Sequence, residues 1–356
     1  MADYSAVLNT STLVNYMREK VQPIFRRSVF MAGLRENGCL TFNNSGKQME
    51  WHPTVIRAEL TAADPYNVSI AFPSRNREII CQLPWRSYNL GEKITKFDKL
   101  ANQGSKVQFV KLVDHIVTQM SQDFTHRFGH KLYVDGNAAA TSRDIHGLQS
   151  CTSNDGTVTG YVGDNDDTYA EKSTALGDLG GDWSGTWPAG TGDYEYHAWT
   201  PMIVDVNNSN FSGDTWKENW QEAMNFLFSY MGRLNDREPD VCILNTDWVR
   251  QAKDSLTDYD RFEVSANTRM SNLGHKGLLY NGVELYHEYA CPSSLGFCFN
   301  WDNLELRSMQ SDLIGTMNDF DIESTEDLKA LDFYGNMQIW LPSGIGVLAE
   351  VSDAGT

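Results

Sequence analysis

The chain has 356 residues, of which 41% are apolar and 12% aromatic, a composition that excludes a wholly disordered protein and suits one or two folded domains. Its 29 Lys and Arg against 47 Asp and Glu leave a net charge of −18, which excludes a protein whose main task is to wrap nucleic acid. Residues 1–131 carry 17 Lys/Arg and 11 Asp/Glu, or +6, whereas residues 132–356 carry 12 and 36, or −24. A basic first part and an acidic second part favour head-to-tail assembly of copies of the chain. The same charges would also be found if both parts were simply exposed to solvent.

Targeting signals are missing from the sequence. The N-terminus has no apolar segment behind a basic start, and no run approaches the roughly 18 apolar residues of a membrane span. The protein is therefore expected to stay in a cytoplasm. No cysteines are arranged as C-x-x-C, and several lie in apolar runs, which predicts buried free thiols in a reducing compartment. The six cysteines are Cys39, Cys81, Cys151, Cys242, Cys291 and Cys298.

The first hundred residues predict an arm followed by a projecting ribbon. Residues 5–30 have the pattern of a short helix that passes into an extended arm. Residues 48–60 are rich in β-branched and aromatic residues. Within residues 66–85, two such stretches, NVSIAF and EIICQLPW, are separated by the turn-forming residues that begin at Pro73. The ribbon carries too many arginines for two strands buried on both faces. These are Arg57, Arg75, Arg77 and Arg86.

A long amphipathic helix is predicted over residues 104–128. Apolar residues recur at steps of three and four, and Ser105 with Gln108 has the pattern of a capping box. Gly129 suits the position just after a helix, so the helix is expected to end there. Because Gly129 would separate His126 from His130, a zinc site on these two histidines is not expected.

Residues 150–200 differ in composition from the rest of the chain. Between Cys151 and Trp199 there are nine Gly, nine Asp/Glu and a single basic residue, Lys172, with Trp and Tyr spaced among them. A disordered linker would lack those aromatics, so we predict an irregular surface loop or insertion. Asp164 begins a run that resembles the start of a calcium loop, but the glycine and glutamate that such a loop requires are missing.

The last third predicts alternating helices and strands. Helices are expected at 214–234, where Thr215 and Glu218 form a capping box, and at 247–256. Asn281-Gly282 predicts a type I′ turn. Strands are expected at 241–245, at 276–280 and 283–287 around that turn, at 297–301, and as a closing hairpin of 331–341 and 345–351.

Catalytic motifs are sparse. The sequence contains no phosphate-binding loop, no dinucleotide-binding glycine pattern and no G-x-S-x-G nucleophile elbow. Many carboxylates among Trp-rich loops are also typical of carbohydrate-active hydrolases, and this alternative stays open. We therefore expect no catalytic, cofactor-binding or metal site and no enzymatic activity.

The order of elements resembles the major capsid proteins of tailed bacteriophages, which have the Hong Kong 97-type fold. Residues 82–137 are similar to the passage from the extended loop into the spine helix, and PDVCILNTDWVRQAKD at 239–254 to a strand and helix of the axial domain. Residues 279–308 are similar to a recurring strand–turn–strand stretch of the family, and FYGNMQIWLPSGIGVLAEV at 333–351 to the closing strands of the peripheral domain. Together these stretches span nearly the whole chain.

The resemblance implies an α+β, Hong Kong 97-like capsid fold with the following parts. Residues 1–45 would be the N-terminal arm, 46–103 the extended loop (E-loop), 104–134 the spine helix and start of the peripheral domain, 135–325 the axial domain with the insertion near 150–200, and 326–356 the return strands of the peripheral domain.

The resemblance also implies a role and partners. The chain would form pentamers and hexamers of itself in an icosahedral head shell, assembled in the host cytoplasm and present in the virion. A separate scaffolding protein, a portal and decoration proteins would be partners, with packaged DNA inside the shell, no sequence-specific binding and no membrane. Arg57, Arg75, Arg77 and Arg86 would contact an acidic neighbouring subunit. Another virion component, such as a tail tube or head-decorating protein, is the further alternative.

Some members of this family crosslink an E-loop lysine to an asparagine of a neighbouring subunit. Here Lys47, Lys93 or Lys96 with Asn336 would be the candidates, but no apolar pocket accompanies them in the sequence. We therefore do not expect the crosslink.

Overall fold

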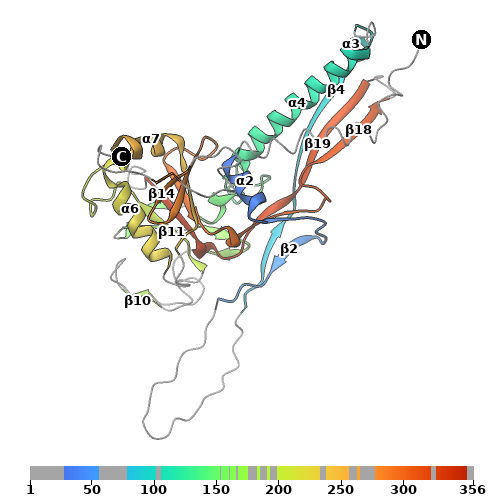
Figure 1. Cartoon of the computed structure of the whole chain (residues 1–356). Helices are drawn as coiled ribbons and strands as arrows, with labels where there is room; N and C mark the ends of the chain where they lie inside the picture. The colour runs from blue at the N-terminus through green and yellow to red at the C-terminus, as the bar shows by residue number, and fades with distance from the viewer. Residues whose placement is uncertain are drawn as a thin grey trace.

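The computed structural model describes residues 28–55, 78–101, 106–152, 154–159, 161–165, 167–174, 183–184, 191–192, 199–232, 238–255, 263–264, 277–321 and 326–350. Figure 1 shows a compact body, from which a long helix and a strand ribbon run side by side as an arm. A second, shorter strand pair leaves the body in a different direction. No described helix is long and apolar enough to cross a membrane.

The body is built on a mixed nine-stranded sheet. Alternate residues of its central strands face opposite sides. On one side Cys242, Leu244 and Leu348 pack against helices α6 (Trp216–Met231) and α7 (Thr246–Ser255). On the other, Phe297 and Phe299 belong to the core that also contains helix α2 (Val29–Glu36). The strands in spatial order are β13 (Glu263–Val264), β14 (Leu278–Tyr280), β15 (Val283–Glu288), β12 (Val241–Asn245), β16 (Leu295–Phe299), β20 (Ile345–Ala349), β11 (Met202–Asp205), β6 (Val162–Asn165) and β5 (Asn154–Thr159).

The arm pairs a helix with a strand ribbon (Figure 1). Helix α4 (Lys106–Lys131) has 26 residues, which makes it about 39 Å long. Helix α3 (Lys96–Ala101) lies at its far end. The ribbon has β19 (Glu326–Ile339) at its centre, with β4 (Arg86–Ile94) along one edge, and β18 (Gly315–Asp321) followed by β17 (Leu304–Ser308) along the other. Strand β1 (Leu40–Thr41) extends this sheet beyond β17.

The remaining elements are short. Strands β2 (Gln48–Trp51) and β3 (Cys81–Pro84) pair antiparallel and form the strand pair that leaves the body. The others are η3 (Leu148–Cys151), β7 (Thr168–Tyr169), β8 (Lys172–Ser173), β9 (Trp183–Ser184), β10 (Thr191–Gly192), η4 (Trp301–Asn303) and η5 (Pro342–Gly344).

The predicted long helix is confirmed, but its predicted end is wrong. Helix α4 continues through Gly129 to Lys131. The Leu132 N–H still donates to the Phe128 carbonyl at 3.3 Å, and the side chains of both residues are buried in the core, which holds the helical backbone on both sides of the glycine. His126 and His130 consequently share one helix face, with ring centroids 5.0 Å apart. Within the described residues no third His, Cys, Asp or Glu joins them as a metal ligand.

Several strand predictions are confirmed. Strand β12 has the predicted bounds, and β14 and β15 form the predicted hairpin. Its turn residues Asn281 and Gly282 have φ values of 52° and 86°, as a type I′ turn requires. The capping box of α6 forms only in part, because the Glu218 carboxylate accepts from the Asp214 N–H and the Thr215 hydroxyl while the Thr215 side chain caps nothing.

The prediction that residues 331–341 and 345–351 form a closing hairpin is wrong. Strand β19 runs in the arm, whereas β20 lies in the body between β16 and the parallel strand β11. The Asn303 side chain holds the crossover between them, donating to the Leu341 carbonyl and accepting from the Leu341 N–H at 2.8 and 2.9 Å. The boundary expected at residue 325 therefore does not follow the sheets: β17 and β18 belong with the arm and β20 with the body.

The cysteine prediction needs one correction. Cys39, Cys81, Cys151 and Cys291 are buried free thiols, as expected, but Cys242 and Cys298 form a disulfide. They are direct partners in the pairing of β12 with β16, although 56 positions separate them in the sequence. Only the strand register brings them together.

Two further predictions, for the N-terminal arm and for the 150–200 region, agree with the structure only in part. Residues 1–27 lie outside the described residues, and the next segment is not extended: helix α2 is buried, with Phe30 and Leu34 fully enclosed. In the 150–200 region, Tyr169 and Trp199 pack into the main core, so they are not exposed platforms for a sugar. Asp164 and Asn165 lie in strand β6.

Candidate assembly surface

The ribbon of the arm has two faces with different surroundings. Directly paired residues of antiparallel strands point to the same side of a sheet. Tyr88 and Phe333, which are such a pair, contact Phe128 of α4 at ring distances of 6.0 and 4.8 Å. Helix α4 therefore covers this face of the ribbon.

The opposite face of the ribbon presents apolar side chains to solvent. Met317 on β18 is 56% exposed and lies opposite Ala330 of β19, two residues from Leu328, which is 38% exposed on the same side. Phe97 in α3 is 77% exposed at the end of the arm. Exposed apolar residues grouped on one projecting element mark an interaction site more often than an ordinary surface.

The arm is fixed to the body by a buried polar network around Asn336 of β19. Its side-chain amide donates to the Pro84 carbonyl and to His146 Nδ1, both at 2.8 Å. Its oxygen accepts from the backbone N–H groups of His146 and Met337 at 2.8 and 2.9 Å. One fully buried side chain thus connects the end of the β2–β3 pair, the segment after α4 and the centre of the ribbon. All polar atoms of the Asn336 side chain are thus bonded within the subunit.

A second polar cluster lies beside the first, at the C-terminal end of α4. Asp144 accepts from Lys131 Nζ at 2.6 Å and from the Tyr88 hydroxyl at 3.0 Å, and that hydroxyl accepts from the Ile145 N–H at 2.9 Å. Burial is the main cause that raises the pKa of Tyr88 above its usual range. The cluster fixes the angle between α4 and β4, because it bonds to the last residue of the helix and to the strand beside it.

The segment before α2 is fixed in a similar way. Glu288, at the end of β15, accepts from the Ser28 hydroxyl, from the Phe30 N–H at 3.0 Å and from the Tyr133 hydroxyl at 2.7 Å. The carboxylate thus caps the N-terminus of α2, where a negative charge is favourable. Its oxygens are occupied by structural donors, which does not suit an acid–base role.

The network gives the protein a pH-dependent stability. Burial, and next the positive charge of Arg86, lower the pKa of His146 from 6.5 to about 4. Between pH 6.5 and 4 the unfolded chain therefore binds a proton that the folded protein does not, so the stabilising contribution is complete above pH 6.5 and is lost as the pH falls toward 4. This difference corresponds to about 3 kcal/mol.

We expect His146→Gln to reduce the loss of unfolding free energy between pH 7 and pH 4.5, measured by urea denaturation at each pH. The substitution removes this titrating group, so only the pH dependence due to the other titrating groups remains. His115→Gln, at an exposed position of α4, is the matched control and should leave the loss unchanged. An equal loss in wild type and His146→Gln would show that His146 does not contribute.

The arginines named from the sequence have different positions. Arg57, Arg75 and Arg77 lie outside the described residues. Arg86 begins β4 opposite Gly335, half-buried and close enough to His146 to affect its pKa, so it lies at the base of the arm. The uncovered apolar face was not predicted from the sequence. The run LKALDFY at 328–334 nevertheless has apolar residues at both odd and even positions, which indicates a strand with partners on both faces.

No protein-family model matches the chain, and no curated protein matches it significantly. Solved structures do match. The "Cyanophage A-1(L) capsid asymmetric unit" is 13% identical, with 91% of this chain and 93% of that chain covered and a TM-score of 0.61. The "Capsid of native GTA particle computed with C5 symmetry" is 11% identical, with 89% of each chain covered and a TM-score of 0.53.

A third similar structure is the "Asymmetric unit of bacteriophage PhiM1 mature capsid", 8% identical over 88% of this chain and 85% of that chain, with a TM-score of 0.53. All three matches extend over both the arm and the body. The chain therefore has the fold of phage capsid proteins, and the resemblance stated from the sequence is confirmed for the fold.

Proposed function

We propose that the protein is a structural major capsid subunit that self-assembles into the icosahedral head shell enclosing a tailed-phage genome. The observation that carries the proposal is the similarity to the cyanophage A-1(L) capsid over 91% of the chain, with arm and body both included. The exposed apolar face of the arm supports it, because a free monomer has no use for such a surface.

The proposal assigns roles to the parts of the chain. The β2–β3 pair is the base of the E-loop, α4 is the spine helix, the ribbon with α4 is the peripheral domain, and the body is the axial domain. The uncovered face of the ribbon packs against a neighbouring copy. A separate scaffolding protein, a portal and decoration proteins act during assembly in the host cytoplasm, and the finished subunit resides in the virion around packaged DNA.

The E-loop arginines are proposed to contact acidic residues of a neighbouring subunit, given the charges of +6 and −24 on the two parts of the chain. We expect Arg75→Glu with Arg77→Glu to prevent assembly at low salt and to leave the circular dichroism spectrum of the subunit unchanged. Lys253→Glu in α7, at an exposed position of the body, is a single charge-reversal control. Normal shells of the double variant at low salt would contradict the electrostatic contact.

Size-exclusion chromatography of the purified full-length chain tests the proposal against an enzymatic role. We expect rings or shells, which elute far ahead of a 40.2 kDa monomer, and no hydrolysis of a panel of glycans. A stable monomer that cleaves one of the glycans would contradict the proposal and favour a carbohydrate-active hydrolase.

A further inference from the structure

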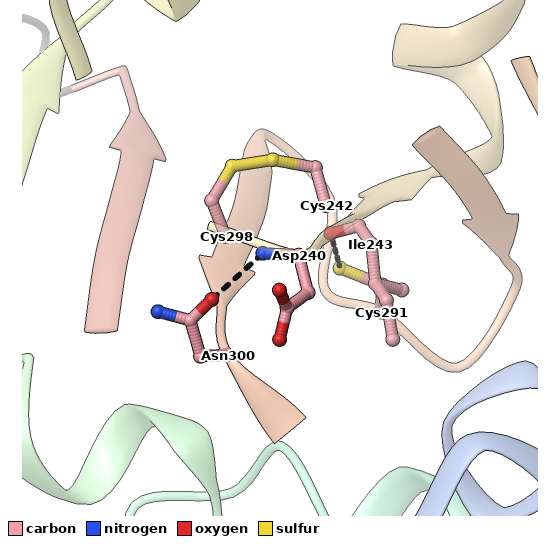
Figure 2. The surroundings of a disulfide bond; sticks show 6 residues. All are labelled: Asp240, Cys242, Ile243, Cys291, Cys298 and Asn300. Atoms are coloured by element: carbon pink, nitrogen blue, oxygen red, sulfur yellow. Dashed lines mark hydrogen bonds between the residues drawn. A yellow bond between two sulfur atoms is a disulfide. The ribbon is translucent and has the colours of Figure 1, made fainter. Parts of the chain in front are cut away.

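The disulfide joins two neighbouring strands at the centre of the body. Cys242 of β12 and Cys298 of β16 lie opposite each other with a Cα–Cα distance of 4.1 Å, and neither is exposed to solvent. Figure 2 shows the bond and the residues around it. The two strands are the fourth and fifth of the nine in the sheet. A covalent bond at this position is unusual for a protein made in a reducing cytoplasm.

The strands remain paired without the bond. Backbone pairing joins β12 and β16 from Val241–Phe299 to Leu244–Gly296, and β15 and β20 pair with their outer edges. At the strand ends the Asp240 N–H donates to the Asn300 side-chain oxygen at 2.9 Å and to the Phe299 carbonyl at 3.2 Å (Figure 2). Two thiols would therefore be held facing each other in the finished fold, and the bond can close without a change of backbone pairing.

The other cysteines do not compete for this pairing. The nearest in sequence to Cys298 is Cys291, whose sulfur donates to the Ile243 carbonyl at 3.9 Å and which belongs to the core on the opposite side of the sheet (Figure 2). Cys291 therefore lies on the other side of the sheet from Cys242 and Cys298, and position rather than burial separates it from the pair.

We propose that Cys242 and Cys298 are a post-assembly oxidation site: the subunit folds and assembles as the dithiol inside the host, and the disulfide closes after the particle leaves the cell. The proposal rests on the proposed capsid function. Molecular oxygen is the oxidant. Two thiols lose two protons and two electrons to form the S–S bond, and one oxygen molecule takes them up as hydrogen peroxide.

Burial determines which reagents can act on the pair. Because neither cysteine is exposed, a tripeptide disulfide such as oxidised glutathione does not reach them, whereas oxygen and peroxide are small enough to enter a packed core. The same burial protects the closed bond from reducing thiols in solution. The bond then joins the two halves of the sheet covalently and closes a long loop, which restricts the unfolded chain.

The direct test follows the thiols of the wild-type chain through time. Particles from cells lysed directly into denaturant at neutral pH with an excess of a small alkylating reagent are compared by peptide mass mapping with released particles kept in air. We expect Cys242 and Cys298 to be alkylated at lysis, and a linked Cys242–Cys298 peptide, lighter by two hydrogens than the two reduced peptides, to predominate after release. A bond already complete at lysis, or thiols that persist after air and peroxide treatment, would overturn the proposal.

A second measurement tests the consequence of the bond. The unfolding temperature of wild type should rise by about 5 °C on air oxidation. Cys242→Ala with Cys298→Ala should show no rise, and Cys291→Ala should show the same rise as wild type. An unchanged unfolding temperature in linked wild type would contradict the stabilising role. The same thiol and melting assays can be carried out on reduced, unassembled subunits exposed to air. A chain that forms no shells would therefore contradict the capsid function, while the oxidation of Cys242 and Cys298 would still be tested separately.

Discussion

Met317→Glu combined with Leu328→Glu is expected to abolish shell formation and to leave the subunit folded. Both side chains lie on the uncovered face of the ribbon, so in the isolated subunit a carboxylate at either position is solvated at little cost. In the proposed shell a neighbouring copy covers the same face. There each apolar side chain contributes about 1.5–3 kcal/mol, and an unpaired carboxylate costs far more.

If each subunit of the proposed shell makes this contact, the penalty is repeated throughout the particle, so we expect assembly to fail completely. Size-exclusion chromatography and circular dichroism measure the two parts of the expectation. Lys217→Glu, at an exposed position of α6, changes the net charge by the same amount as the double variant and should still assemble. If the double variant formed normal shells, the uncovered face would not be a subunit contact.

Asn336→Leu is expected to cause the largest loss of stability among single substitutions in the network. Leucine has a similar size but no polar atoms, so the Pro84 carbonyl and the His146 N–H are left buried without their partner. Each such group costs about 1–3 kcal/mol, so the free energy of unfolding should fall by roughly 3–5 kcal/mol.

Urea denaturation at pH 7 measures this loss. Asn89→Leu, at an exposed position of β4, is the matched control and should change the unfolding free energy by less than about 0.5 kcal/mol. A loss below about 1 kcal/mol for Asn336→Leu would mean that the polar network does not hold the arm to the body. Assembly of the variant is informative as well, because a loosened base should produce irregular particles.

Local patterns predicted those elements whose residues determine their own conformation. Strand β12, the Asn281-Gly282 turn and the body of α4 follow from hydrophobic runs, turn chemistry and helical periodicity. The order of these elements was enough to indicate the fold that the capsid structures share. The end of α4 was not predictable in this way, because burial of Phe128 and Leu132 in the core keeps the helix going past Gly129.

The features that the sequence analysis missed depend on contacts between distant segments. Strand β20 was predicted to pair with β19, but five residues carry the chain from β19 to a strand of a different sheet. The Asn303 side chain that directs this crossover comes from elsewhere in the chain. The disulfide depends on the register of β12 with β16. The candidate surface depends on which face of the ribbon α4 leaves uncovered, which periodicity alone does not show.

Negative-stain electron microscopy of the purified full-length chain tests the central claim most directly. The capsid proposal predicts closed shells of uniform diameter, or the pentameric and hexameric rings from which they are built, without any added enzyme or cofactor. Stacked tubes would contradict it in favour of a tail component. Monomers that stay dispersed at high concentration and across salt conditions, with or without a scaffolding protein, would contradict it altogether.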